Sequence, residues 1–106
     1  EVRRALAENK GISDAIAGQL ATDKEVKVRF GLAQNEKISA HLFDYLAHDQ
    51  EKLVRQGALR NSNARLELLA GFLHDPEEDV RIETYRLKAL PIELLEEKAN
   101  FFLRKK

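Results

Sequence analysis

The chain has 106 residues, with 18 basic and 18 acidic side chains and no cysteine. This length suits one domain or part of one. Without cysteine there can be no disulfide, thiolate metal ligand or cysteine nucleophile, and the balanced charge argues against non-specific binding to nucleic acid or membranes. No apolar run reaches the roughly 18 residues of a membrane span, and no signal-peptide pattern is present, so we expect a cytoplasmic protein.

A period of 26 residues organises the sequence. The dipeptide Val-Arg begins at positions 2, 28, 54 and 80, and one asparagine column and one aspartate column keep the same step. An uninterrupted period of this length is typical of stacked helical repeats. We therefore predict a single all-α domain over residues 1–106, built from about four two-helix units. The units cover about residues 1–26, 27–52, 53–78 and 79–106.

In the first unit, Val2 and Leu6 are predicted to turn inward on a short helix, which Asn9 ends in the left-handed conformation. Ser13 or Asp14 then caps a second helix. The apolar stripe of that second helix comprises Ile12, Ile16, Leu20 and Ala21. The unit lacks an atypical capping sequence, so we expect either that more repeats precede it in a longer array or that its apolar end packs on another chain.

The second unit has the most regular pattern. Val28, Leu32 and Ala33 are expected to face inward on the first helix, Gly31 to let a neighbouring backbone approach, and Ser39 to cap the second helix. The inner face of this second helix comprises Ile38, Leu42, Phe43, Leu46 and Ala47. The third unit repeats the pattern with Val54, Ala58 and Leu59, followed by Ala64, Leu68, Leu69, Phe72 and Leu73.

The fourth unit departs from the period, with Leu87 and Phe101 in place of asparagine and aspartate. Pro91 fits the first turn of a last helix, where its missing N–H costs nothing. Because terminal repeats are atypical, we interpret this unit as a C-terminal cap. One helix face cannot bury all of residues 101–103, so self-association would use the chain ends.

The aspartate, arginine and asparagine columns predict a structural ladder between units. An arginine lies six residues after each aspartate, so it can reach back to that aspartate or on to the aspartate of the next unit as a bidentate pair. Asparagine can end a helix and hydrogen-bond the turn. The ladder residues are Asn9, Asn35, Asn61, Asp23, Arg29, Asp49, Arg55, Asp75 and Arg81. An arginine row that grips phosphates is the alternative.

The outward row of the second helices is the candidate partner surface. Tyr45 is its one aromatic residue, and exposed tyrosine is enriched at interfaces. The row becomes acidic toward the C-terminus, which favours a basic partner. The candidate partner-binding residues are His41, Asp44, Tyr45, His48, Glu67 and His74. The alternative is a solvated face without a partner.

No catalytic or cofactor motif is present. The acidic run Glu77-Glu78-Asp79 falls in a loop, and three glutamates lie on the polar face of the last helix, so neither group has the dissimilar environments that separate two carboxylate pKa values. The sequence has no serine elbow, phosphate-binding glycine loop or metalloprotease helix. His48 and His74 share one column, but a zinc site needs further ligands. We predict no enzyme, no cofactor and no metal.

The second unit resembles the leucine-rich repeat variant family through Val28-Arg29, Leu32-Ala33-Gln34-Asn35 and Leu42 to Leu46-Ala47-His48-Asp49. The resemblance covers the first three units well and the fourth poorly, and the Asp–Arg spacing also resembles HEAT and armadillo repeats. It implies a right-handed superhelix, or α-solenoid, in which α-helices alternate with short 3₁₀-helices, so the Val-Arg segments would be 3₁₀. It also implies an interaction scaffold. The family's proline after asparagine is missing, and without cysteine no iron–sulfur module is carried over.

The function predicted from the sequence is therefore non-catalytic protein–protein interaction with an unidentified partner. The runner-up is a nucleic-acid-binding helical-repeat module, for which the candidate cations are Lys27, Arg29, Arg60 and Arg65. These cations are spread over different columns, which makes nucleic acid the weaker prediction. A structural spacer is the third alternative, and it predicts no exposed apolar or aromatic cluster beyond the chain ends.

Overall fold

The computed structural model describes residues 2–61 and 70–87, in which all regular structure is helical and no strand occurs. The α-helices are α1 (Val2–Ala7), α2 (Asp14–Leu20), α3 (Val26–Ala33), α4 (Ala40–Ala47), α5 (Lys52–Arg60) and α7 (Glu78–Leu87), and residues 70–72 are also helical. The all-α prediction is confirmed for this part of the chain. No helix within it is long and apolar enough to cross a membrane.

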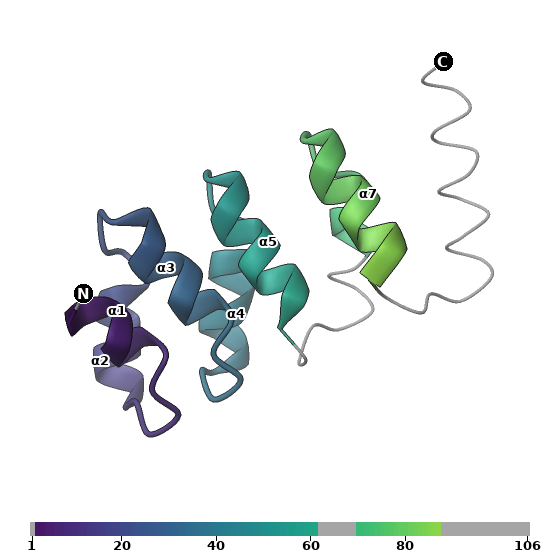
Figure 1. Ribbon diagram of the computed structural model, residues 1–106. Helices are drawn as coiled ribbons and strands as arrows, with labels where there is room; N and C mark the ends of the chain where they lie inside the picture. The colour runs from purple at the N-terminus through teal and green to yellow at the C-terminus, as the bar shows by residue number, and fades with distance from the viewer. Residues whose placement is uncertain (1, 62–69, 88–106) are drawn as a thin grey trace, which may run out of the picture.

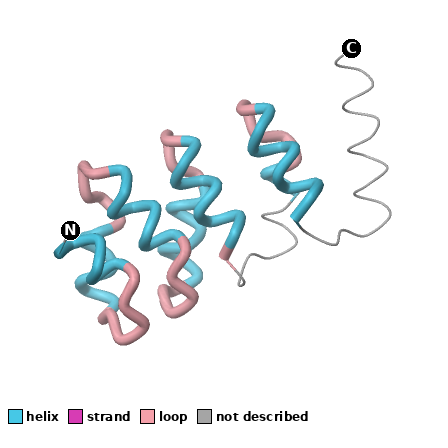
Figure 2. Tube along the Cα trace, in the orientation of Figure 1, coloured by secondary structure: helices cyan, strands magenta, loops and turns pink. Residues whose placement is uncertain are grey.

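The helices that carry the Val-Arg dipeptides follow one another in a row. Figure 1 shows α1, α3, α5 and α7 side by side, and each contacts the next one along the chain. Helix α2 packs against α1 and α3, while α4 packs against α3 and α5. Figure 2 shows the loops, in pink, at the ends of these helices. Each helix therefore finds its principal contacts among its near neighbours in sequence.

All four helices in this row are α-helices, so the 3₁₀ geometry implied by the family resemblance is wrong for the described residues. Helices α3, α5 and α7 have eight, nine and ten residues, respectively. A 3₁₀-helix rarely continues beyond three or four residues because its hydrogen-bond geometry is poorer. Packing against neighbouring helices favours the α form at these lengths.

Serine side chains cap the N-terminal ends of α2 and α4. Ser13 Oγ accepts a hydrogen bond from the Ile16 N–H at 3.3 Å, and Ser39 Oγ accepts one from the Leu42 N–H at 3.2 Å. Serine is thus the N-cap of both α2 and α4, and each bond satisfies one of the free N–H groups at a helix start. Of the two caps that the sequence allowed for α2, the structure uses Ser13, and Asp14 is the first helical residue.

The asparagines close their turns by a side-chain bond. Asn9 Oδ1 accepts from the Gly11 N–H at 2.7 Å, and Asn35 Oδ1 accepts from the Lys37 N–H at 2.9 Å. No non-glycine residue described has a positive φ, so the left-handed conformation expected at Asn9 is wrong. The side-chain bond reverses the chain locally, so the backbone need not enter that less favourable region.

Three inward positions of each interior helix form the core. Val28, Leu32 and Ala33 on α3 are buried, and so are Val54, Ala58 and Leu59 on α5, as expected. Further core residues come from α2, α4 and the segment at 72–73, namely Ala17, Leu20, Phe43, Leu46, Ala47, Phe72 and Leu73. All of these residues except Leu73 belong to one hydrophobic cluster, so each helix pair shares its core with the next.

The first helix departs from this pattern. Val2 is 76% exposed and Leu6 is 40% exposed, although Ala7 at the neighbouring position is fully buried. The inward orientation predicted for Val2 and Leu6 is therefore wrong. The equivalent residues Val28 and Leu32 are covered because α3 contacts α1, whereas no described helix covers the corresponding side of α1.

Close backbone approach occurs at Gly57 rather than at Gly31. A Cβ atom at Gly57 would lie 3.1 Å from the carbonyl oxygen of Phe30, whereas a Cβ atom at Gly31 would meet only the side chains of Ala7 and Glu8. The sequence predicted this role at Gly31, one unit too early. Helix α5 passes close to α3 at this position, so a side chain larger than glycine would require Phe30 or Ala33 to shift.

Candidate partner-binding groove

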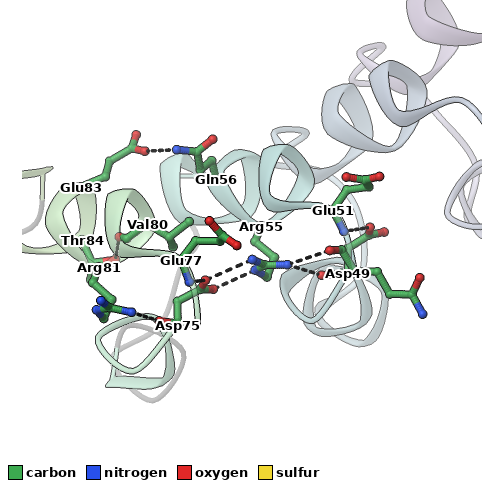
Figure 3. A network of polar contacts seen from close by, with 11 residues as sticks. Asp49, Glu51, Arg55, Gln56, Asp75, Glu77, Val80, Arg81, Glu83 and Thr84 are labelled. Carbon is green, nitrogen blue, oxygen red and sulfur yellow. Dashed lines mark hydrogen bonds and ion pairs between the residues drawn. The ribbon is translucent and has the colours of Figure 1, made fainter.

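Arg55 links two aspartates that belong to consecutive units (Figure 3). Its Nε and Nη2 atoms donate to the two carboxylate oxygens of Asp75 at 2.7 and 3.1 Å. Its Nη1 atom donates to the backbone carbonyl of Asp49 at 2.8 Å. The side chains of Arg55 and Asp75 are only 11% and 4% exposed, so this bidentate pair lies in a low-dielectric setting, where it is stronger than at the surface.

Arg29 makes the same connections one unit earlier. Its Nε and Nη2 atoms donate to the Asp49 carboxylate at 2.8 and 3.2 Å, and its Nη1 atom donates to the Asp23 carbonyl at 2.6 Å. The carboxylate of Asp49 raises the pKa of Arg29 above its ordinary value. Arg3 reaches Asp23 at 2.7 Å but is 54% exposed, and Arg81 donates to the Asp75 carbonyl. Each described arginine of the ladder is thus occupied by protein oxygens.

The asparagine side chains also join consecutive units. Asn35 Nδ2 donates to the backbone carbonyls of Ala7 and Asn9 at 2.7 and 3.0 Å. Asn61 Nδ2 donates in the same way to the carbonyls of Ala33 and Asn35, at 2.8 and 3.1 Å. Sequence reasoning identified the turn role of these residues but missed this link, for which their 26-residue spacing was the only signal.

Three of the candidate partner-binding residues lie together in a groove between the C-terminal ends of α2 and α4. The α2–α4 groove has a volume of about 530 Å³, within the range of small-ligand sites. Its lining residues are Ala21, Thr22, Arg29, Asp44, Tyr45, His48, Asp49 and Gln50. Tyr45 is 52% exposed there. The structure therefore brings together Asp44, Tyr45 and His48, which all belong to one helix and its C-cap.

An adjoining groove of about 330 Å³ continues toward the next unit. It contains His74, Gly71 and Pro76, and it shares His48 and Asp49 with the α2–α4 groove. His48 and His74 therefore line one cavity, as their common column suggested. His41 is exposed on α4 but lines neither groove, and Glu67 lies outside the described residues. The other predictions outside the described part of the chain are those for Ala64, Arg65, Leu68, Leu69, Pro91 and residues 93–103.

One ring nitrogen of His48 faces the helix that this residue caps. Its Nδ1 atom lies 2.8 Å from the carbonyl oxygen of Asp44, and a carbonyl oxygen can only accept, so Nδ1 carries the hydrogen. The Nε2 atom of the neutral ring then presents a lone pair. Thr22 occupies the same column on α2, where its hydroxyl donates to the Gln19 carbonyl at 3.1 Å. No pattern in the sequence indicates this side-chain bond.

Neither grouped metal ligands nor a row of unoccupied arginines occurs in the described segments. No group of three or more histidine, aspartate or glutamate side chains there could hold a metal ion. Of the four nucleic-acid candidates, Arg29 is paired with Asp49 and Arg60 with Glu83. Lys27 is exposed on α3, and the fourth candidate is not described. Two of the three described candidates for phosphate binding are thus engaged with carboxylates.

Comparisons with protein-family models, curated proteins and solved structures find no match to this chain. The function proposed below rests on the geometry of the described residues.

Proposed function

We propose that the chain is a non-catalytic scaffold for protein–protein interaction, built as a right-handed α-solenoid of the kind that the leucine-rich repeat variant family implies. The row of α1, α3, α5 and α7 supports a stacked arrangement, as do the matching bonds of Arg29 and Arg55. Units that contact only their neighbours leave an extended surface along the stack, which repeat proteins use for binding. A cytoplasmic location fits the absence of cysteine.

The single observation that carries the proposal is the half-exposed Tyr45 in the α2–α4 groove. Tyrosine supplies a large rigid contact area with a polar tip, and such residues dominate the binding energy of many interfaces. A purely structural spacer does not require an exposed aromatic ring beside a groove.

Photo-crosslinking tests this surface directly. A benzophenone amino acid placed at position 45 should capture a discrete protein from cells that make the chain, because the side chain there points into the contact region. The same group at Lys27, an exposed position on α3, is the control. The Asp44→Lys variant should weaken capture at position 45 without unfolding the chain. Equal capture from both positions, or capture that ignores Asp44→Lys, would remove the groove from consideration.

Nucleic-acid binding remains the alternative proposal and has less support. It requires free cations, whereas Arg29 and Arg60 already form ion pairs. A nucleic-acid-binding chain would be retained on heparin with a steep dependence on salt concentration. We expect elution at low salt.

A further inference from the structure

The rim of the α2–α4 groove presents hydrogen-bond acceptors side by side. Asp44 and His48 are one helical turn apart on α4, and their side chains are 64% and 71% exposed. His48 Nδ1 is held by the Asp44 carbonyl, so the Nε2 lone pair of the neutral ring is available to a donor. The Asp44 carboxylate lies 3.9 Å from His48 Nδ1, so a carboxylate and an imidazole ring lie close together on this rim. Both groups can accept hydrogen bonds from a ligand group that carries several N–H donors.

The charge of the groove is negative. Arg29 and Asp49, which both line it, neutralise each other through their bidentate pair. Asp44 has no lysine or arginine partner among the residues that the structure describes. Its ion-pair neighbour there is His48, whose Nδ1 lies 3.9 Å from the Asp44 carboxylate, so Asp44 has no permanently charged counter-ion among the described groove residues.

The helix ends add to this negative potential. Both α2 and α4 terminate at the groove, and neither has a basic residue in its last turn. The C-terminal end of a helix carries a partial negative charge, which attracts cations. A cation bound in the groove would thus interact favourably with the Asp44 carboxylate and with two helix ends.

We propose that the α2–α4 groove binds a lysine or arginine side chain carried by an extended segment of a partner protein. The cationic group donates to the Asp44 carboxylate and to His48 Nε2, and its apolar stem lies along the Tyr45 ring. Neighbouring residues of the segment occupy the adjoining groove, which shares His48 and Asp49 with this one. The inference rests on the proposed scaffold function and names the chemistry of its partner.

The test selects peptides from a phage-displayed library of random nine-residue sequences on the immobilised 106-residue chain. The wild type is compared with Asp44→Asn, with Tyr45→Ala and with Asp14→Asn, which neutralises an exposed carboxylate at the far end of α2. Circular dichroism confirms that each variant is folded. We expect lysine or arginine to be enriched at least threefold at one position by the wild type and by Asp14→Asn. Neither Asp44→Asn nor Tyr45→Ala should show this enrichment.

The outcomes separate this inference from the scaffold function. Selected peptides that depend on Tyr45 but show no basic preference would overturn the inference and leave the scaffold in place. The same holds if no peptide is selected while crosslinking from position 45 succeeds, because the partner would then not be an extended segment. Failure of both experiments would overturn the inference and the scaffold together. A preference for basic residues that Asp44→Asn retains would also contradict the role given to that carboxylate.

Discussion

At the scale of single residues, Asn35 performs two tasks with one side-chain amide. Its Oδ1 atom closes its own turn, and its Nδ2 atom binds two carbonyl oxygens of the preceding unit. The residue is 5% exposed and its bond to the Ala7 carbonyl is buried, so water has little access to that bond. A buried polar group that loses its partner costs more free energy than the bond contributes when formed.

Replacing Asn35 with alanine should therefore lower the free energy of unfolding by about 2–3 kcal/mol, because it leaves the Ala7 carbonyl without its partner. Urea denaturation measures the change. Asn9→Ala is the matched control, since Asn9 is exposed and its side chain accepts the turn bond from the Gly11 N–H, which lies within its own unit. That control should cost less than about 1 kcal/mol. Equal losses in the two variants would show that the amide does not link units.

Sequence spacing predicted the turn role of these asparagines but could not reveal their second partners. A period shows that residues are equivalent, and local chemistry then suggests contacts within one unit. The contact with Ala7 spans 28 positions, and it depends on how two helices approach each other in space. The same limit applies to Val2 and Leu6, whose periodicity predicted burial although no described helix covers them.

At the scale of helices, the approach of α5 to α3 depends on Gly57. Gly57→Ala would place a methyl group 3.1 Å from the Phe30 carbonyl oxygen and 3.3 Å from Ala33 Cβ. We expect the variant to lose about 1–2 kcal/mol of stability, because overpacking outweighs the gain in helix propensity. Gly18→Ala in α2 has open space around the new methyl group and should gain up to about 1 kcal/mol. Thermal unfolding of both variants should give melting temperatures that shift in opposite directions.

The arginine ladder joins α3 to Asp49, in the loop before α5, and α5 to Asp75, in the loop before α7. Arg55→Met should cost about 3–5 kcal/mol, because it leaves the buried Asp75 carboxylate without its cation. Arg3→Met removes the equivalent pair at an exposed position and should cost at most about 1 kcal/mol. Urea unfolding of the two variants compares buried and exposed forms of one interaction. A similar cost at both positions would mean that burial does not set the strength of the ladder.

The sequence predicted this ladder more closely than the asparagine links. Spacing placed an arginine within reach of two aspartates, and the structure shows it on the carboxylate of the later one and on the backbone of the earlier one. Spacing alone could not choose between these aspartates, because the choice depends on the stagger of α3, α5 and α7. The groove could likewise be predicted only in part. The periodicity predicted that Tyr45 and Asp44 face outward, whereas the hollow beside them depends on where α2 and α4 end in space.

At the scale of the whole molecule, the carboxylates set the response to acid. The N–H of Glu25 and the guanidinium of Arg3 lower the pKa of Asp23, and Lys52 lowers that of Asp79. A carboxylate whose pKa is lowered on folding contributes stability above its unfolded pKa of about 3.9 and loses it as pH falls through the folded value. The urea midpoint should thus be level near neutral pH and fall below about pH 4. The urea midpoint of the Asp23→Asn variant should fall less steeply with decreasing pH than that of the wild type. If the two midpoints decline in parallel, Asp23 does not contribute to the acid response.

The arginine bonds also restrict how the length of this chain can change. Arg29 and Arg55 each bind the carbonyl of an aspartate six residues back and the carboxylate of an aspartate twenty residues ahead. Adding or removing a single residue between those partners would break one of the two bonds. A duplication or deletion of 26 residues preserves both, since it replaces each partner with its equivalent. A gene that encodes such a chain can therefore gain or lose length without loss of register only in whole steps.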